Sequence, residues 1–476
     1  MTESDRTSNT AVINVGLPLF ADAVRQQGAL VQDVAWTIPA EGDSADIASL
    51  KVAYGESSAA IDESNNEVVR RLNEGIPLLT GVVPAQQAVD AFADGMLLLH
   101  SGPPIEPDHL CDPLLRSMTA AAVCEGWART VDEAEAMVQQ GKIRIAPAND
   151  HGAVVPMATA MGPTTPVWVA EDAESGTNAI APVNQGSGDV AWFGKNSDGA
   201  RKRLDFLREV AQPRLASVLK KLGPIDIFSL AAQGLVMGDD VHIRTQATTN
   251  LLIRDMLPGL AELPADDHAA ALAEYLATNH LFYLTIAMAG AKSLTRHAEQ
   301  VPDATIVTTM ARNGTDFGIK RAGSDAWVVT AAPPVGDALF YPGFGPSHGA
   351  PDIGDSAVLE LVGLGGAAAA GSPAVAAFLG GSMADAERAT NEMRRICSGT
   401  STRLKLPIQE FTGTPVGVDL RKVVETHLTP KVTTGILHAS SGEGQIGAGV
   451  ATAPVDVFRQ CLKDFTDQST SGGRRQ

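Results

Sequence analysis

Aromatic residues and positive charge are both scarce in this 476-residue sequence. Phe, Trp and Tyr make up 5% of the chain, and 36 Lys and Arg stand against 55 Asp and Glu, which gives a net charge of −19. A protein that binds nucleic acid needs basic side chains for the phosphates and commonly aromatic rings for the bases. No run of Lys and Arg interleaved with aromatic residues is present. We therefore expect no nucleic-acid partner.

Cysteine is scarce as well, and a membrane signature is missing. The four cysteines lack CxxC spacing, which excludes a zinc ribbon and argues against disulfides: Cys111, Cys124, Cys397 and Cys461. Residues 1–10 lack the charged-then-apolar order of a secretion signal. The most apolar window, residues 359–381, contains Glu360 and Pro373 and has no flanking aromatic belts, so we interpret it as a buried, Ala-rich helix. We expect a cytoplasmic protein without a membrane partner.

The order of expected strands and helices defines a fold class. Residues 11–15 and 30–36 are predicted strands with an amphipathic helix between them, which is the order of a doubly wound α/β layer. Residues 95–100 form a further predicted strand that ends in a Gly- and Pro-rich loop, a place where ligands of open α/β sheets collect. Helical patterns and later strands complete the assignment: helices at residues 67–93 (with a break at Pro77), 118–140, 199–222 and 251–296, and strands at 305–309 and 326–330.

These elements predict an α+β protein of several domains, because one hydrophobic core seldom organises so long a chain. We expect an N-terminal Rossmann-like α/β layer at residues 1–145. A mixed α+β main domain is expected at residues 146–198 and 300–476, with a mostly helical insertion at residues 199–299.

Two loop clusters carry groups suited to acid/base chemistry and anion binding. Asp150 and His151 lie in a Gly- and Pro-rich loop, where an imidazole can act as a general acid or base; the alternative is a histidine that caps a turn. Asn184, Gln185 and Gly186 offer side-chain amides beside flexible N–H groups, which suit a carboxylate, phosphate or ureide oxygen; a plain turn is the alternative.

A third cluster brings three ionisable side chains and an arginine together within six positions. Asp239, Asp240 and His242 precede Arg244 after an apolar helical stretch. Asp240 and His242 could ligate a metal, but no second histidine stands at ligand spacing. A polar network that orients Arg244 is the more economical interpretation, and a solvated helix start is the alternative.

A fourth cluster follows the predicted strand at residues 305–309. Arg312 can clamp a carboxylate or phosphate through its planar fork, and Asn313 and Gly314 form a turn beside it. Gly365 and Gly366 match no nucleotide-binding loop, and we expect no bound cofactor and no resident metal.

A fifth cluster places carboxylates at the start of an apolar segment, where they are costly unless paired. Asp352, Asp355 and Glu360 could pair with Arg312 or Arg244, cap a helix, or hold a cation. Capping of a helix N-terminus by Asp355 is the simplest of these interpretations.

Taken in order, these motifs resemble the YlbE/YahG family. The resemblance runs nearly end to end through residues 13–17, 100–105, 125–128, 237–244, 310–319, 351–356 and 445–449. It implies a subunit of a carbamoyltransferase-type enzyme with an FdrA-like partner subunit, in a homo- or hetero-oligomer. The reaction that the resemblance implies converts oxalurate and phosphate to oxamate and carbamoyl phosphate in allantoin breakdown. The implied ligands are therefore a small ureide or amide carboxylate and phosphate.

The sequence departs from the family pattern at Gln185, where the family tends to have Glu, and at Ile243, Thr245 and Thr433, where it tends to have Asn. These departures suggest a different substrate or a weaker activity. The Ser-Thr-Arg-Thr phosphate loop of the classical carbamoyltransferases is absent from the sequence.

The hypothesis for the mechanism assigns roles within one anion-holding pocket. His151 donates a proton to the leaving nitrogen with Asp150 as its orienter, Arg312 and Arg244 hold anions, and the amides of Asn184 and Asn313 hold carbonyl oxygens. The remaining residues of the predicted substrate site are Gln185, Gly186, Gly314, Asp239, His242, Asp352 and Asp355. Two alternatives stay open: a metal-dependent amidohydrolase with Asp240, His242, Asp352 and Asp355 around a cation, and a non-catalytic partner of an FdrA-type enzyme.

Overall fold

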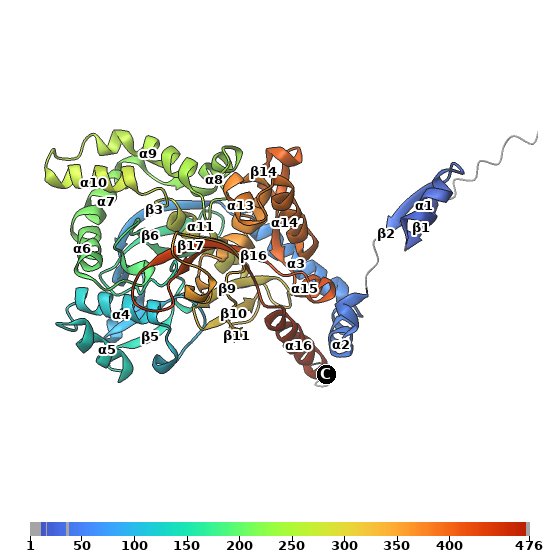
Figure 1. Ribbon diagram of the computed structural model, residues 1–476, viewed down its shortest axis with the longest axis horizontal. Helices are drawn as coiled ribbons and strands as arrows, with labels where there is room; N and C mark the ends of the chain where they lie inside the picture. Colours follow the sequence, from blue (N-terminus) through green and yellow to red (C-terminus); the bar gives the residue numbers. More distant parts are fainter. Residues whose placement is uncertain (1–10, 16, 35–37, 473–476) are drawn as a thin grey trace, which may run out of the picture.

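A small β-α-β unit begins the chain in the computed structural model, which describes residues 11–15, 17–34 and 38–472. Strands β1 (Ala11–Val15) and β2 (Leu30–Val34) pair in parallel, with helix α1 (Pro18–Arg25) between them. The unit stands apart from the main body of the molecule (Figure 1). The predicted β-α-β order is confirmed here, while residues 1–10, Gly16 and the predicted strand end at residues 35–36 lie outside the described residues.

A four-stranded antiparallel sheet of order β7-β6-β3-β8 lies within the main body. Its strands are β3 (Pro77–Pro84), β6 (Pro166–Asp172), β7 (Asn178–Pro182) and β8 (Ile225–Asp226). Helix α11 (Leu284–Ala298) packs against β6 and β7, and nearly all of its residues are buried. The predicted helix at residues 67–93 is wrong beyond Glu74, because α3 (Ser58–Glu74) ends there and the apolar run after Pro77 pairs with β6 as a strand.

Strands β4 (Leu97–His100) and β5 (Arg144–Pro147) form a second parallel pair. The crossover between them contains α4 (Asp112–Cys124) and α5 (Val131–Gln139). The predicted helix at residues 118–140 is therefore two helices, and Gly126 between them has a φ of +76° that an α-helix cannot contain. The parallel strands form two separate pairs instead of one sheet, so the Rossmann-like detail is not confirmed.

The C-terminal half supplies three antiparallel units. One sheet has the order β11-β10-β9-β13, with β9 (Val307–Asn313), β10 (Asp316–Arg321), β11 (Val328–Ala331) and β13 (Ile353–Gly354). A second sheet has the order β12-β17-β16, with β12 (Asp337–Phe340), β16 (Lys431–Leu437) and β17 (Gln445–Thr452). The third unit is a hairpin of β14 (Cys397–Leu406) and β15 (Thr412–Val418).

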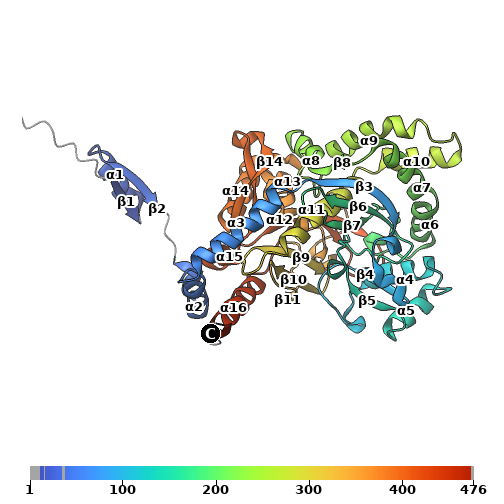
Figure 2. The same ribbon diagram turned by 180° about the vertical axis from the view of Figure 1, so that it is seen from behind.

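Helices cover these sheets, as the α+β class predicts. The segment predicted to be mostly helical contains α6 (Asp198–Phe206), α7 (Gln212–Leu222), α8 (Ile227–Val236), α9 (Gln246–Leu260), α10 (Asp267–Thr278) and α11, while its status as an insertion stays a prediction. Further helices are α2 (Ser44–Ala53), α14 (Met383–Ile396), α15 (Leu420–Thr426) and α16 (Val455–Gly472). Seen from behind, α3 crosses the body and packs against α11 and β14 (Figure 2).

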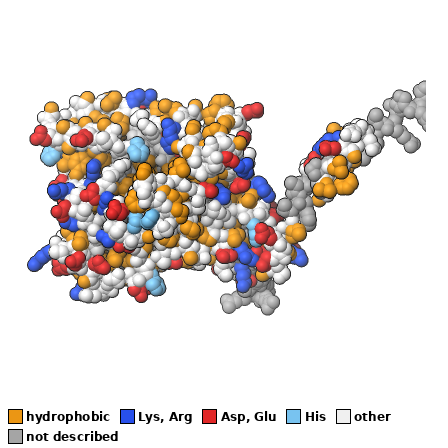
Figure 3. All heavy atoms as spheres, viewed as in Figure 1, with side chains coloured by type: hydrophobic (Ala, Val, Ile, Leu, Met, Phe, Trp, Pro, Cys, Tyr) orange, Lys and Arg blue, Asp and Glu red, His pale blue; other side chains and the backbone are white. Residues whose placement is uncertain are grey.

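The apolar window at residues 359–381 is buried up to Ala370 and partly exposed beyond it, and it is not one helix. It divides into α12 (Val358–Leu361), a 3-10 turn at Gly365–Gly371 and α13 (Pro373–Phe378). Across the described residues, no helix combines the length and the apolarity that a membrane crossing needs. Acidic and basic side chains are interspersed over the face shown in Figure 3.

The largest hydrophobic cluster draws on all three predicted domain ranges. It includes Leu114 from the N-terminal range, Leu252 from the helical range and Leu359 from the main range. The three-domain division stays a prediction.

Candidate functional site

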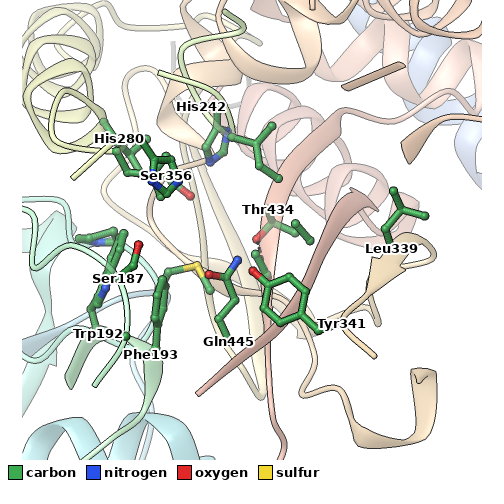
Figure 4. Close-up of a pocket in the computed structure, with 18 of the residues that line it drawn as sticks. Ser187, Trp192, Phe193, His242, His280, Leu339, Tyr341, Ser356, Thr434 and Gln445 are labelled. Atoms are coloured by element: carbon green, nitrogen blue, oxygen red, sulfur yellow. Dashed lines mark hydrogen bonds between the residues drawn. The ribbon is translucent and has the colours of Figure 1, made fainter. Parts of the chain in front are cut away.

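A cavity of about 870 Å³ opens between the helical segment and the β12-β17-β16 sheet. Figure 4 shows Ser187, Trp192 and Phe193 on one side of it, Thr434, Gln445 and Tyr341 on the other, and His242, His280 and Ser356 at one end. Its volume is in the range of small-molecule sites. Among the described residues that line it, Lys195 is the sole lysine or arginine.

His242 forms a buried pair with Glu360 at the wall of this cavity. Its Nδ1 lies 2.8 Å from Glu360 Oε1, and the exposed fractions of the two side chains are 4% and 0%. Because a carboxylate accepts, Nδ1 carries the hydrogen and Nε2 is the atom left for a ligand. No protein partner for Nε2 is seen among the described residues, and Figure 4 shows the ring directed into the cavity. The arrangement is that of an oriented general acid or base.

Backbone N–H groups hold the Glu360 carboxylate in place beside the imidazole. Its Oε1 also accepts the N–H groups of Gly366 at 3.1 Å and of Thr433 at 3.2 Å. Gly365 has a φ of +58°, and a Cβ there would lie 2.1 Å from Glu360 Oε1 and 2.9 Å from His242 Nδ1. The glycine at this position therefore allows the His–Glu pair to form.

Asp240 fixes the loop that carries His242, between α8 and α9. Its carboxylate accepts the N–H groups of His242 at 3.3 Å and Arg244 at 2.8 Å, while Thr433 Oγ1 donates to it at 3.1 Å. Burial raises the pKa of Asp240, although His242 and these N–H groups act in the opposite direction. The loop also places Val241 in the left-handed region, with a φ of +61°. Asp240 therefore positions His242 through its backbone.

Arg312 lies behind the cavity wall with its planar fork occupied. Its Nε and Nη2 donate to the two oxygens of Asp352 at 2.7 and 3.0 Å, and both side chains are fully buried. Thr434, which lines the cavity, donates its hydroxyl to Asp352 at 3.0 Å. The predicted pairing of Asp352 with Arg312 is thus confirmed, and this geometry leaves no free fork for a substrate carboxylate. The catalytic role given to Arg312 stays a prediction, and the contacts seen here connect Arg312 to the cavity through Asp352 and Thr434.

The Asp355 carboxylate forms hydrogen bonds with two loops that are distant in sequence, beside the same cavity wall. Its oxygens accept the N–H groups of Gly102 at 2.8 Å and Val155 at 2.9 Å, so it does not cap α12 as the sequence suggested. The next residue, Ser356, lines the cavity. Burial raises the pKa of Asp355 to about 7, against the lowering effect of the two N–H groups and of Arg312.

This raised pKa makes stability depend on pH. The folded pKa of Asp355 of about 7 lies above the value of about 4 for an unfolded aspartate, so its contribution is complete below about pH 4 and is lost as pH rises through 7. The loss is at most about 1.4 kcal/mol per pH unit. We expect the unfolding free energy of the wild type, relative to Asp355→Asn, to fall from pH 5 to pH 7 and to level off at pH 8. Denaturant titrations at each pH measure the difference, and parallel pH profiles for the two proteins would contradict it.

Other predicted site residues lie away from this cavity. Asp150 pairs with Lys320 and accepts the indole N–H of Trp327 at 3.0 Å. His151 lines a different cleft, which shares no lining residue with the first. The predicted gathering of these two residues with the other clusters in one pocket therefore does not occur, and their catalytic role stays a prediction.

The remaining predicted residues mostly build turns and helix starts. Asn184 Oδ1 accepts the N–H of Gly186 at 2.8 Å in the loop that leads to Ser187. Asn313 Oδ1 accepts N–H groups within the turn at Gly314 that joins β9 to β10. Asp239 accepts the N–H groups of Ala247 and Thr248 at the start of α9, and it also pairs with Arg244 at 3.2 Å.

A metal centre does not form from the four residues of the amidohydrolase alternative. Within the described part of the chain, three ligand atoms within 4.8 Å of one another occur only at Asp172, Glu174 and His297, far from the predicted set in sequence. Asp352 and Asp355 are instead satisfied by Arg312 and by backbone N–H groups.

Sequence reasoning missed Glu360 and Lys195 as site residues. A buried carboxylate inside an apolar segment was a signal for Glu360, because such a group needs a partner. Its partner lies 118 positions away, and no local pattern identifies it. Lys195 follows the loop of Trp192 and Phe193 without any motif of its own.

A cavity of this size, lined mainly by apolar side chains with a few polar groups, is typical of a protein that binds a small molecule. A family model described as oxamate carbamoyltransferase subunit AllG matches residues 143–356. Oxamate carbamoyltransferase subunit AllG of Escherichia coli K12 is 34% identical over 416 residues, which cover 87% of this chain and 99% of the relative. The uncharacterized protein YahG of the same organism is 30% identical over 460 residues, covering 96% and 97%. The chain therefore belongs to the AllG family, as its resemblance to YlbE/YahG proteins predicted.

A solved structure shares the fold. A conserved protein of unknown function from Enterococcus faecalis V583 superposes with a TM-score of 0.82 at 31% identity, covering 86% of this chain and 98% of that one.

The positions expected to depart from the family pattern lie at or near the cavity. Gln185 accepts the N–H of Trp192 at 3.0 Å, and Thr245 donates to the carbonyl of His280 at 2.9 Å. Ile243 lines the cavity itself, and Thr433 binds Asp240 and Glu360. These four positions thus belong to segments that shape this site.

Proposed function

We propose that the chain is a subunit of a carbamoyltransferase that acts on a small ureide or amide carboxylate. The reaction is oxalurate and phosphate to oxamate and carbamoyl phosphate, or a close relative of it, in complex with an FdrA-like partner subunit. Membership of the AllG family supports the reaction class. The observation that carries the proposal is the buried His242–Glu360 pair, whose free ring nitrogen faces a cavity with a mostly apolar lining and a few polar groups.

The cavity offers groups for each part of the reaction. Lys195 supplies positive charge for phosphate or the substrate carboxylate, and Thr434 and Gln445 offer hydrogen bonds to the amide groups. A phosphate oxygen forms a bond to the carbamoyl carbon while the C–N bond to the oxamate nitrogen breaks. His242 Nε2 gives its proton to that leaving nitrogen, and the proton of phosphate restores it. Glu360 stabilises the imidazolium.

The proposal is tested by combining the purified chain with its FdrA-like partner, oxalurate and phosphate, and following carbamoyl phosphate by ³¹P NMR. We expect product from the complex and a much slower formation of it when His242→Asn replaces the wild type. A complex that gives no carbamoyl phosphate overturns the reaction. A His242→Asn complex with full turnover removes His242 from the chemistry and favours the alternative of a non-catalytic partner.

A further inference from the structure

The cavity beside His242 is much larger than oxalurate and phosphate need. Its volume of about 870 Å³ lies toward the upper end of the ~300–1,000 Å³ range in which protein sites enclose drug-sized ligands. Oxalurate and phosphate are both far smaller than such ligands. A substrate that fills this cavity therefore carries a further group, and the lining decides what kind of group it is.

Three side chains beside His242 form an apolar wall, namely Ile243, Leu339 and Phe378. Ile243 follows His242 in the loop between α8 and α9, Phe378 ends α13, and Leu339 lies in β12. Ile243 and Phe378 pack against one small hydrophobic cluster that contains Val450 of β17, the strand that pairs with β12. Helix α13 contacts both of these strands. The wall is thus built from three segments that the fold brings to one part of the cavity.

Much of this apolar wall is in contact with solvent. Ile243 and Phe378 are partly buried, and Leu339 is 53% exposed. Tyr341, which follows β12 and also lines the cavity, is 48% exposed. Figure 4 shows Leu339 and Tyr341 on the same side of the cavity. Exposure of apolar surface to water is unfavourable, so an apolar ligand group that covers this wall contributes to binding.

The apolar wall and the free nitrogen of His242 are within reach of one small ligand. Ile243 is the next residue after His242, so their Cα atoms are about 3.8 Å apart. Both side chains line the same cavity. His242 Nε2 has no protein partner among the described residues and is directed into the cavity (Figure 4). A substituent next to a ureide nitrogen bound at Nε2 can therefore extend to Ile243.

We propose that the substrate of this cavity carries an apolar side group that packs against Ile243, Leu339 and Phe378, and that Ile243 determines this specificity. The substrate class is a ureide carboxylate with an apolar side chain, which is larger than oxalurate. The inference rests on the proposed function, because it names the substrate class of the same site, and it leaves the reaction step unchanged.

The test compares two ureido acids that differ only in an isobutyl group, N-carbamoylglycine and N-carbamoyl-L-leucine. Isothermal titration calorimetry of the full-length chain, with phosphate present, measures their binding. We expect the leucine derivative to bind at least about tenfold more tightly, because a small apolar group already contributes this much in an apolar site. Ile243→Ser should reduce the ratio of the two affinities several-fold. Leu339→Ser, at a more exposed position, should reduce it as well and serves if Ile243→Ser does not fold.

Ile408→Ser is the matched control, because Ile408 is 50% exposed and does not line the cavity. It should leave the ratio unchanged. A preference for the leucine derivative that a wall variant weakens and Ile408→Ser keeps supports the inference. Equal binding of the two ureido acids, tighter binding of the glycine derivative, or no binding of either overturns it. A preference that neither wall variant changes also overturns it.

The ³¹P NMR assay with oxalurate keeps the inference and the proposed reaction apart. Carbamoyl phosphate formed from oxalurate, together with equal binding of the two ureido acids, overturns the inference and leaves the proposed reaction standing. A wall-dependent preference for the leucine derivative, together with no carbamoyl phosphate from any ureide, supports the ligand class and overturns the proposed reaction.

Discussion

Replacing His242 by Asn is expected to lower kcat of the assembled enzyme by roughly 10²–10⁴-fold, the range for loss of a general acid or base. Asparagine keeps a hydrogen-bond donor toward Glu360, but it has no titratable group that could replace His242 Nε2 as the proton donor. The pair is buried at 2.8 Å and its carboxylate is held by two further N–H groups, so the protein should remain folded. Initial rates with saturating oxalurate and phosphate measure the effect.

Two further variants test whether His242 and Glu360 act together in catalysis. Glu360→Gln should lower kcat by less, and the double variant should lose no more than His242→Asn alone, because residues that act together are not additive. His268→Asn, at an exposed position on α10, is the matched histidine control and should keep full activity. An unchanged kcat in a well-folded His242→Asn enzyme would remove this residue from the chemistry.

Local patterns predicted the elements whose signal lies within a few residues. The strand at residues 95–100 and the helices of residues 199–299 follow from apolar runs and periodicity. The strand after Pro77 was missed, because a short apolar run fits a buried helix as well as a strand until its partner is known.

The candidate site was predicted in its residue types more than in its geometry. His242 was named, but as a substrate contact, and its proton role depends on Glu360, which only the tertiary fold brings to it. Asp150 and His151 carried the same local signal and lie at a different cleft. Chemistry-bearing loops can be recognised in a sequence, whereas the strand order that decides which loops meet cannot be obtained from local patterns.

Replacing Arg312 by Met is expected to destabilise the fold by about 3–5 kcal/mol, because it leaves the Asp352 carboxylate buried without its partner. The two charges are fully buried and joined by two hydrogen bonds, and Arg312 also donates to the carbonyl of Gly354. Urea unfolding of the wild type and the variant measures the loss.

We attribute the loss of stability to the buried Asp352 carboxylate that is left unpaired, and not to the loss of attraction between the two charges. A second substitution separates these two causes. Arg312→Met combined with Asp352→Leu should recover most of the stability, since a buried ion pair replaced by apolar side chains is often neutral. Arg254→Met breaks a pair with Asp255 in which both side chains are exposed, and it should cost less than about 1 kcal/mol. If Arg312→Met costs no more than Arg254→Met, Asp352 finds other partners in the variant, and the buried pair does not hold Thr434 at the cavity wall.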